Sequence, residues 1–178
     1  MGTTPSDTFL HFALGAVRDM ASNPIQAGAL GATSVFADTI RPTLVSFSIS
    51  MDEDAEQITV TFDETVDSTS LVIGSISLQQ VTDTAAVSHT LTNADADSFE
   101  SLTIFQDSDG TVLVVTFSKA DADELKRKEI CLTADSCFLA LASTTIVDMS
   151  RRPLVAVETT AARQAANLID DTTPPTLV

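Results

Sequence analysis

The side chains of this chain that could do chemistry are mainly carboxylates, and they gather where the chain is expected to turn. The 178 residues hold 25 Asp and Glu but only 9 Lys and Arg. Calcium is bound in proteins by about six to eight oxygen atoms, many of them from carboxylates. Calcium is therefore the cofactor that this composition suits. The candidate ligands are Asp38, Asp52, Asp54, Glu64, Asp67, Asp170 and Asp171.

These acids fall in three predicted settings. Two linkers hold Asp38 and the Asp170–Asp171 pair, and a hairpin turn and the end of the following strand hold the others. For any one of them, a solvated turn carboxylate is the simpler interpretation. Together they are compatible with calcium at the junctions between modules, and mutual repulsion along a long extracellular fibre or adaptation to salty surroundings accounts for the same charge equally well.

Residues suited to catalysis are not grouped in the sequence. His11 and His89 are isolated and lie in no metal-binding spacing. The chain has no nucleophile elbow, Gly-rich phosphate loop or Cys-pair zinc motif. We therefore expect no enzyme activity.

The net charge of −16 excludes some partners. Nucleic acids and anionic membranes both attract basic surfaces, so neither is an expected partner. No segment is long and apolar enough to predict membrane insertion. Trp and Tyr are absent, which argues against sugar recognition by ring stacking and leaves the core to Phe, Leu, Ile and Val.

The two cysteines, Cys131 and Cys137, flank a short turn-like segment at 133–136. A disulfide is geometrically possible if they stand on either side of a tight connection. Two buried free thiols are the alternative, and the spacing leaves both open.

Alternation of apolar and polar residues predicts a chain made mostly of strands. The predicted strands are residues 9–17, 43–50, 57–62, 71–78, 87–91, the hairpin 102–105 with 112–117, residues 138–142, and a final pair at 145–147 and 154–157. The predicted core side chains are Val45, Phe47, Ile58, Val60, Phe62, Leu113, Val115, Phe117 and Phe138.

One short helix interrupts the strands. Ser118 is its predicted cap, with Asp121 three residues later. Acids come early and bases late along residues 122–128, which suits the helix dipole. Many short strands with polar turns and a single helix predict an all-β fold, an antiparallel β-sandwich.

The chain also repeats part of itself. Residues 9–25 match residues 138–154 at a separation of 129, and residues 38–45 match residues 171–178 at a separation of 133. The match predicts three parts: residues 1–41 as the tail of a preceding repeat with its linker, residues 42–171 as a full module, and residues 172–178 as the start of the next. Asp19 and Asp148 occupy matching positions, and we expect each to accept backbone hydrogen bonds in its own turn.

Three motifs carry a resemblance to a known family. They are the Pro-Thr-Leu-Val opening at 42–45, the segment Thr61-Phe62-Asp63-Glu64-Thr65-Val66-Asp67, and Val147-Asp148-Met149 with Pro153-Leu154. They resemble the opening, the strand and the turn of bacterial Ig-like surface domains. The whole chain is similar to Ig-like or cadherin-like tandem repeats of large cell-surface proteins in bacteria and diatom-type algae.

The resemblance implies an exported stalk or adhesive module that is joined end to end with copies of itself, with calcium at the junctions in some relatives. The expected function is a non-enzymatic structural or adhesive repeat, located outside the cell, at the cell surface or in the cell wall. Its expected partners are neighbouring repeats, together with a homotypic or surface partner that the tail at 3–41 could contact. The alternative is a calcium-dependent module that binds carbohydrate or a mineral surface.

Overall fold

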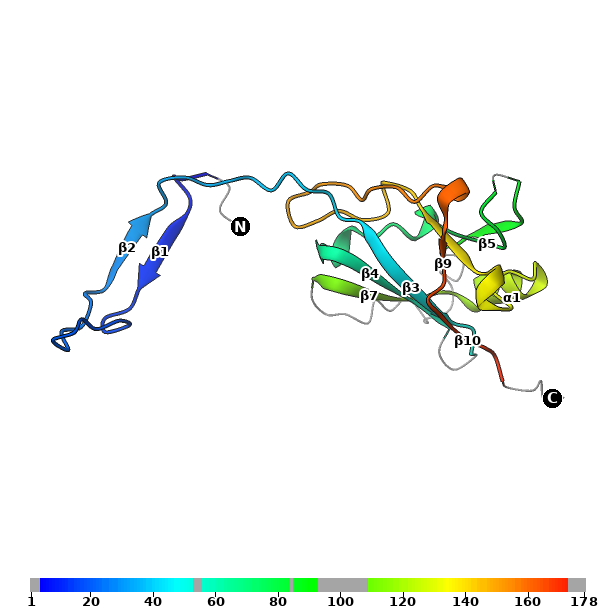
Figure 1. Cartoon of the computed structure of the whole chain (residues 1–178), viewed down its shortest axis with the longest axis horizontal. Helices are drawn as coiled ribbons and strands as arrows, with labels where there is room; N and C mark the ends of the chain where they lie inside the picture. The colour runs from blue at the N-terminus through cyan, green and yellow to red at the C-terminus, as the bar shows by residue number, and fades with distance from the viewer. Residues whose placement is uncertain (1–3, 53–55, 84, 93–108, 173–178) are drawn as a thin grey trace. The chain divides into compact units, whose positions relative to one another are not determined.

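The chain divides into two compact units, which are described one at a time. A computed structural model describes residues 4–52, 56–83, 85–92 and 109–172. The units are Met1–Thr39 and Ile40–Val178. The first is built on one antiparallel hairpin, with β1 (Phe9–Phe12) paired to β2 (Gly28–Gly31) (Figure 1).

The second unit contains two four-stranded sheets. One has the order β10-β3-β4-β7, and the other has the order β6-β5-β8-β9. All neighbouring strands are antiparallel except β10, which runs parallel to β3. The prediction of a mostly β chain with antiparallel sheets is confirmed. The strands are β3 (Leu44–Ser50), β4 (Gln57–Val66), β5 (Ile76–Gln79), β6 (Ser88–Thr90), β7 (Gly110–Thr116), β8 (Phe138–Leu141), β9 (Arg163–Gln164) and β10 (Asn167–Ile169).

Both sheets contribute to one buried apolar cluster. Ile58, Val60 and Phe62 alternate along β4 and are almost fully buried, as the period-two pattern predicts. Leu78 and Leu139 lie directly opposite each other on β5 and β8, and both are 0% exposed. Because each sheet alone has only one small apolar face, sharing a core removes both faces from water.

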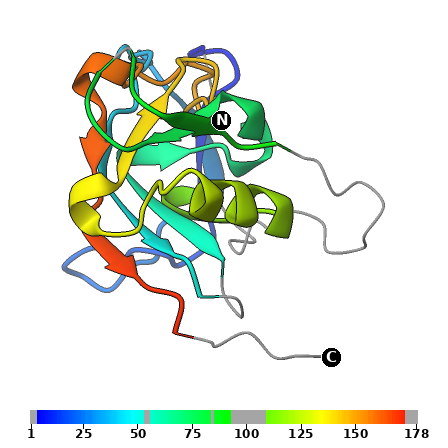
Figure 2. The same ribbon diagram turned by 90° about the vertical axis from the view of Figure 1, so that its right-hand side faces the viewer.

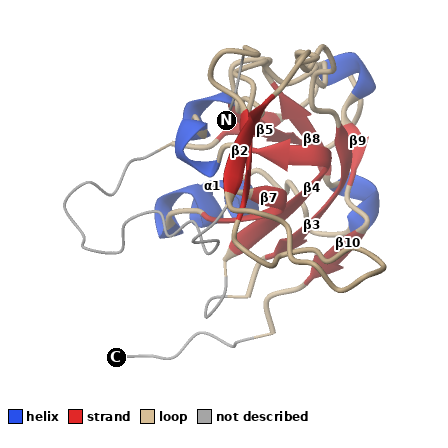
Figure 3. Ribbon diagram, turned by 90° about the vertical axis from the view of Figure 1, so that its left-hand side faces the viewer, coloured by secondary structure: helices blue, strands red, loops and turns tan. Residues whose placement is uncertain are grey.

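The edges of the two sheets are joined at two places. Helix α1 (Lys119–Arg127) follows β7, the edge of one sheet, and contacts β6, the edge of the other (Figure 2). On the opposite edge, only two residues separate β9 from β10, so the chain crosses directly between the sheets (Figure 3). These crossings hold the two sheets against each other.

The predicted helix is confirmed, and its cap is the predicted one. The Ser118 hydroxyl accepts a hydrogen bond from the Asp121 backbone N–H at 3.1 Å. The Asp121 carboxylate is itself buried, with His89 Nε2 at 2.7 Å and the Thr92 backbone N–H at 3.0 Å from its oxygens. The helix is therefore tied to the end of β6 through a hydrogen-bonded carboxylate.

Three strand predictions differ from the structure. The strand predicted at residues 9–17 ends at Phe12. Residues 71–78 form a strand only from Ile76 onward, because the preceding segment makes 3-10 turns at Ser68–Ser70 and Ile73–Ser75. Residues 145–147 and 154–157 contribute isolated bridges rather than strands. The predicted strand at 102–105 and its turn lie outside the described residues, and the partner strand is β7.

The core prediction is wrong at Val45, which is 43% exposed. The pairing of β3 with β4 is irregular between Leu44 and Ser46, so a bulge occurs at Val45 and its side chain is turned outward. Leu44 packs on the core instead, and Phe138 is half-buried rather than buried. The other predicted core residues are all buried.

Cys131 and Cys137 form a disulfide, with an S–S distance of 2.02 Å. It closes the short segment that contains the 3-10 turn Ala134–Ser136. Within the described part of the chain, no helix has the length and apolar character needed to cross a membrane.

The bulge leads to a paired stability prediction. Phe47→Ala removes a fully buried ring and should lower the free energy of unfolding by about 3–5 kcal/mol. Val45→Ala, two residues earlier on the same strand, should lower it by less than about 1 kcal/mol, because this side chain faces solvent. Urea unfolding followed by far-ultraviolet circular dichroism measures both. Equal losses would contradict the outward position of Val45.

Candidate metal centre

The seven predicted calcium ligands are spread over the chain. Asp54 lies outside the described residues, and Asp38 lies in the first unit. The other five belong to the second unit. Among these, Asp170 is exposed and Asp52 is half-buried, with its backbone N–H donating to the Ser50 hydroxyl at 3.4 Å.

Asp67 has a structural role. It caps the 3-10 turn at Ser68–Ser70 by accepting hydrogen bonds from the Thr69 backbone N–H and hydroxyl at 3.0 and 2.5 Å. These hydrogen bonds, led by the one from the hydroxyl and aided by the nearby Arg151 guanidinium, hold the pKa of Asp67 below its ordinary value. The carboxylate is thus occupied by its own turn and by an ion pair at 3.1 Å.

Asp171 forms an ion pair with helix α1. Its carboxylate accepts a hydrogen bond from Lys126 Nζ at 2.8 Å, and Lys126 also faces Glu56 at 3.7 Å. Burial is the main cause that raises the pKa of Glu56, and Lys126 opposes it. The predicted ligand at the second linker therefore already has a cationic partner.

Glu64 is brought close to a residue that was expected to be structural. Val66 of β4 forms a bridge with Asp148, and the backbone N–H of Asp67 donates to the Val147 carbonyl at 2.9 Å. These bonds join the end of β4 to the turn at 147–154. One carboxylate oxygen of Glu64 and one of Asp148 consequently lie within 4.8 Å of each other.

Asp148 organises its turn as predicted. Its Oδ1 accepts hydrogen bonds from the backbone N–H groups of Ser150 at 2.7 Å and Arg152 at 2.8 Å. The residue is only 1% exposed, and its Oδ2 is buried with no hydrogen-bond donor. Sequence reasoning missed this half-satisfied carboxylate because burial is a tertiary property. The sequence marks Asp148 only as a repeated position, because it matches Asp19 in the first copy.

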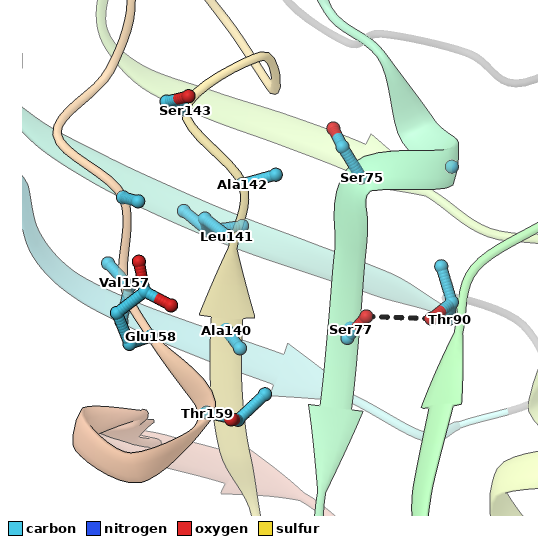
Figure 4. Close-up of a pocket in the computed structure, with 12 residues that line it drawn as sticks. Ser75, Ser77, Thr90, Ala140, Leu141, Ala142, Ser143, Val157, Glu158 and Thr159 are labelled. Atoms are coloured by element: carbon cyan, nitrogen blue, oxygen red, sulfur yellow. Dashed lines mark hydrogen bonds between the residues drawn. The ribbon is translucent and has the colours of Figure 1, made fainter. Parts of the chain in front are cut away.

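A shallow hollow of about 450 Å³ lies on the β6-β5-β8-β9 sheet (Figure 4). It is open because small side chains line it, and the hydroxyls of Ser77 and Thr90 are hydrogen-bonded to each other at 2.7 Å. Its lining holds one carboxylate, Glu158, and no histidine, cysteine or lysine.

Comparison of this chain with protein-family models, with curated proteins and with solved structures finds no match.

The turn at Asp148 predicts a stabilising substitution. Arg151 has φ of 67°, in the left-handed region that favours glycine. Arg151→Gly should raise the free energy of unfolding by about 1 kcal/mol, because the strain of a side chain there is removed. Arg151 is 76% exposed in its ion pair with Asp67, and Thr69 still donates to that carboxylate in the variant, so losing the pair takes little from that gain. Thermal unfolding measures the change, and a clear destabilisation would contradict the strained conformation.

The lowered pKa of Asp67 predicts a pH dependence. A folded-state pKa below the unfolded value gives stability that is present above the unfolded pKa, near 3.8, and is lost as the pH falls through the folded pKa. Asp67→Asn should therefore melt below the wild type at pH 6, with the difference shrinking toward pH 2. Melting curves from pH 6 to pH 2 measure it. A difference that stays constant with pH would contradict a role for the charge.

Proposed function

We propose that this chain is a non-enzymatic structural module from an array of similar modules, exported to the cell surface or cell wall, where it acts as a stalk or cohesion unit. The module would be the second unit, an Ig-like sandwich. The proposal rests on one observation: two segments of this chain, 129 residues apart, take the same hairpin and turn.

The turn is matched bond for bond. In the first unit, the Asp19 backbone N–H donates to the Asn23 carbonyl at 3.0 Å, and Ser22 has φ of 67°. In the second unit, the Asp148 backbone N–H donates to the Arg152 carbonyl at 2.9 Å, and Arg151 has φ of 67°. Two non-glycine residues in the same uncommon conformation, at the same separation, support a common module design.

The strands beside the turn are matched as well. Phe12 pairs with Gly28 in the first unit, and Leu141 pairs with Val157 in the second, both members being 129 residues apart. Two residues earlier on the strand, Leu10 pairs with Leu30, and its counterpart Leu139 pairs with Arg163. The partners Leu30 and Arg163 are 133 residues apart rather than 129, because the second copy has four extra residues after Val157.

The insertion accounts for the two separations in the sequence. The 3-10 turn Thr159–Ala161 lies in the inserted stretch. From Arg163 onward the separation is 133, the same value that relates Asp38 to Asp171 and Pro42 to Pro175. One insertion therefore accounts for both matches, which supports a single repeat rather than two chance resemblances.

The exposed apolar side chains of the hairpin fit the tail of a neighbouring module. Phe9 and Leu10 are 54% and 57% exposed, whereas their counterparts Phe138 and Leu139 are half-buried and fully buried. In the second unit this strand lies between β5 and β9 in the sheet, and Leu139 packs in the core. The disulfide supports export, because disulfides persist in oxidising surroundings.

A force experiment tests the structural role. An array of identical copies of residues 42–171, stretched in an atomic force microscope, should unfold in evenly spaced steps of about 40 nm each, the length of a released module. Carrying Phe47→Ala in every copy should lower the unfolding force, and Val45→Ala is the matched control. Extension without regular force peaks would contradict a mechanical module.

A further inference from the structure

The turn at Asp148 and the end of β4 bring two carboxylates close together in the second unit. Glu64 is half-buried and Asp148 is 1% exposed. A carboxylate oxygen from each lies within 4.8 Å of the other. Two carboxylates so close and so little solvated repel each other, unless a cation or a proton lies between them.

The Oδ2 atom of Asp148 is the second observation. Oδ1 is fully used by two backbone N–H groups of the turn, whereas Oδ2 is buried and accepts no hydrogen bond. A buried charged oxygen without a donor is costly. Asp121, which is also 1% exposed, has donors on both oxygens from His89, Thr92 and Ser118.

The matching turn in the first unit shows how the same carboxylate is satisfied without a ligand. Asp19 Oδ1 accepts from the backbone N–H groups of Ala21 and Asn23 at 2.9 and 2.8 Å. Its Oδ2 accepts from Asn23 Nδ2 at 3.0 Å, and the residue is exposed. In the second unit Arg152 replaces this asparagine, so the amide donor is missing where burial makes it most needed.

We propose that Asp148 and Glu64 bind a divalent cation, and that calcium is the ion they suit. Hard carboxylate oxygens are its preferred ligands, and water can complete the shell beside a half-buried glutamate. Two carboxylates are few, so the expected affinity is that of extracellular modules, with a dissociation constant of about 10⁻⁴–10⁻³ M. Asp67 is not a ligand, because Thr69 and Arg151 hold its carboxylate.

The cation would fasten the end of β4 to the turn at 147–154. A bridge at Val66, one backbone hydrogen bond from Asp67 and the Asp67–Arg151 ion pair already join them, and the cation would add a further link. The mechanical consequence, a module stiffened by calcium, rests on the proposed function, whereas the binding itself does not.

The test uses the full chain after treatment with chelator. Calorimetric titration with calcium chloride should show saturable binding. Melting followed by circular dichroism should shift up by about 5–10 °C at calcium a hundredfold above the dissociation constant. Sodium chloride at equal ionic strength should not give this shift. Circular dichroism is the suitable probe because the chain has no Trp or Tyr.

Three variants locate the site. Asp148→Asn keeps an oxygen for the two backbone N–H groups and removes the charge, so it should melt no lower than the wild type in chelator and lose the calcium shift. Glu64→Gln should also lose the shift. Asp19→Asn, in the matching turn, should keep it.

Two results would overturn the site: no calcium shift in the wild type, or a shift that survives in both Asp148→Asn and Glu64→Gln. Neither result would touch the proposed structural role, which the stretching experiment decides. If Asp148→Asn does not fold, Glu64→Gln and the calorimetric titration still decide the question.

Discussion

The apolar space between the two sheets is the constraint on which the second unit depends. Each sheet has four strands and one apolar face that must be removed from water. Both must turn one face inward, and their edges must be closed so that the faces stay together. Helix α1 closes one side, and the direct step from β9 to β10 closes the other. Polar groups then have to be satisfied wherever the chain crosses between the sheets, as the buried carboxylate of Asp121 is.

Local pattern predicted those parts of the fold that local forces decide. The alternation along β4 predicted its buried face, and the Ser118 cap predicted the start of α1. Long-range bonds decided the rest. The apolar run at 71–78 looks like a strand, but the Val72 backbone N–H donates to the Thr145 carbonyl and a 3-10 turn follows. Along β3 the apolar residues Leu44 and Val45 are adjacent, and the local sequence does not decide which of the two faces the core.

The acidic composition predicted a calcium site, and Glu64 of the proposed pair is among the seven predicted ligands, whereas Asp148 is not. Turn carboxylates in the sequence look alike, whereas their hydrogen-bond partners in the fold differ. Thr43 donates to Asp63 from its hydroxyl and its backbone N–H, which lowers the pKa of that carboxyl. Arg127 and Lys128 lower the pKa of Glu124 to about 2. Such carboxylates already have hydrogen-bond donors or cationic partners in the fold. A sequence pattern cannot distinguish them from a carboxylate whose oxygen has no donor.

Comparison of the two matching turns isolates the property that separates them. Asp19 and Asp148 organise their turns through the same backbone bonds, so turn formation needs only Oδ1. What differs is the environment of Oδ2, which is solvated and bonded to Asn23 in one turn and buried without a donor in the other. With arginine in place of asparagine and the turn buried, the second carboxylate oxygen is left without a donor. The binding role proposed for it depends on Glu64 of β4, a residue far away in sequence that the fold brings within reach.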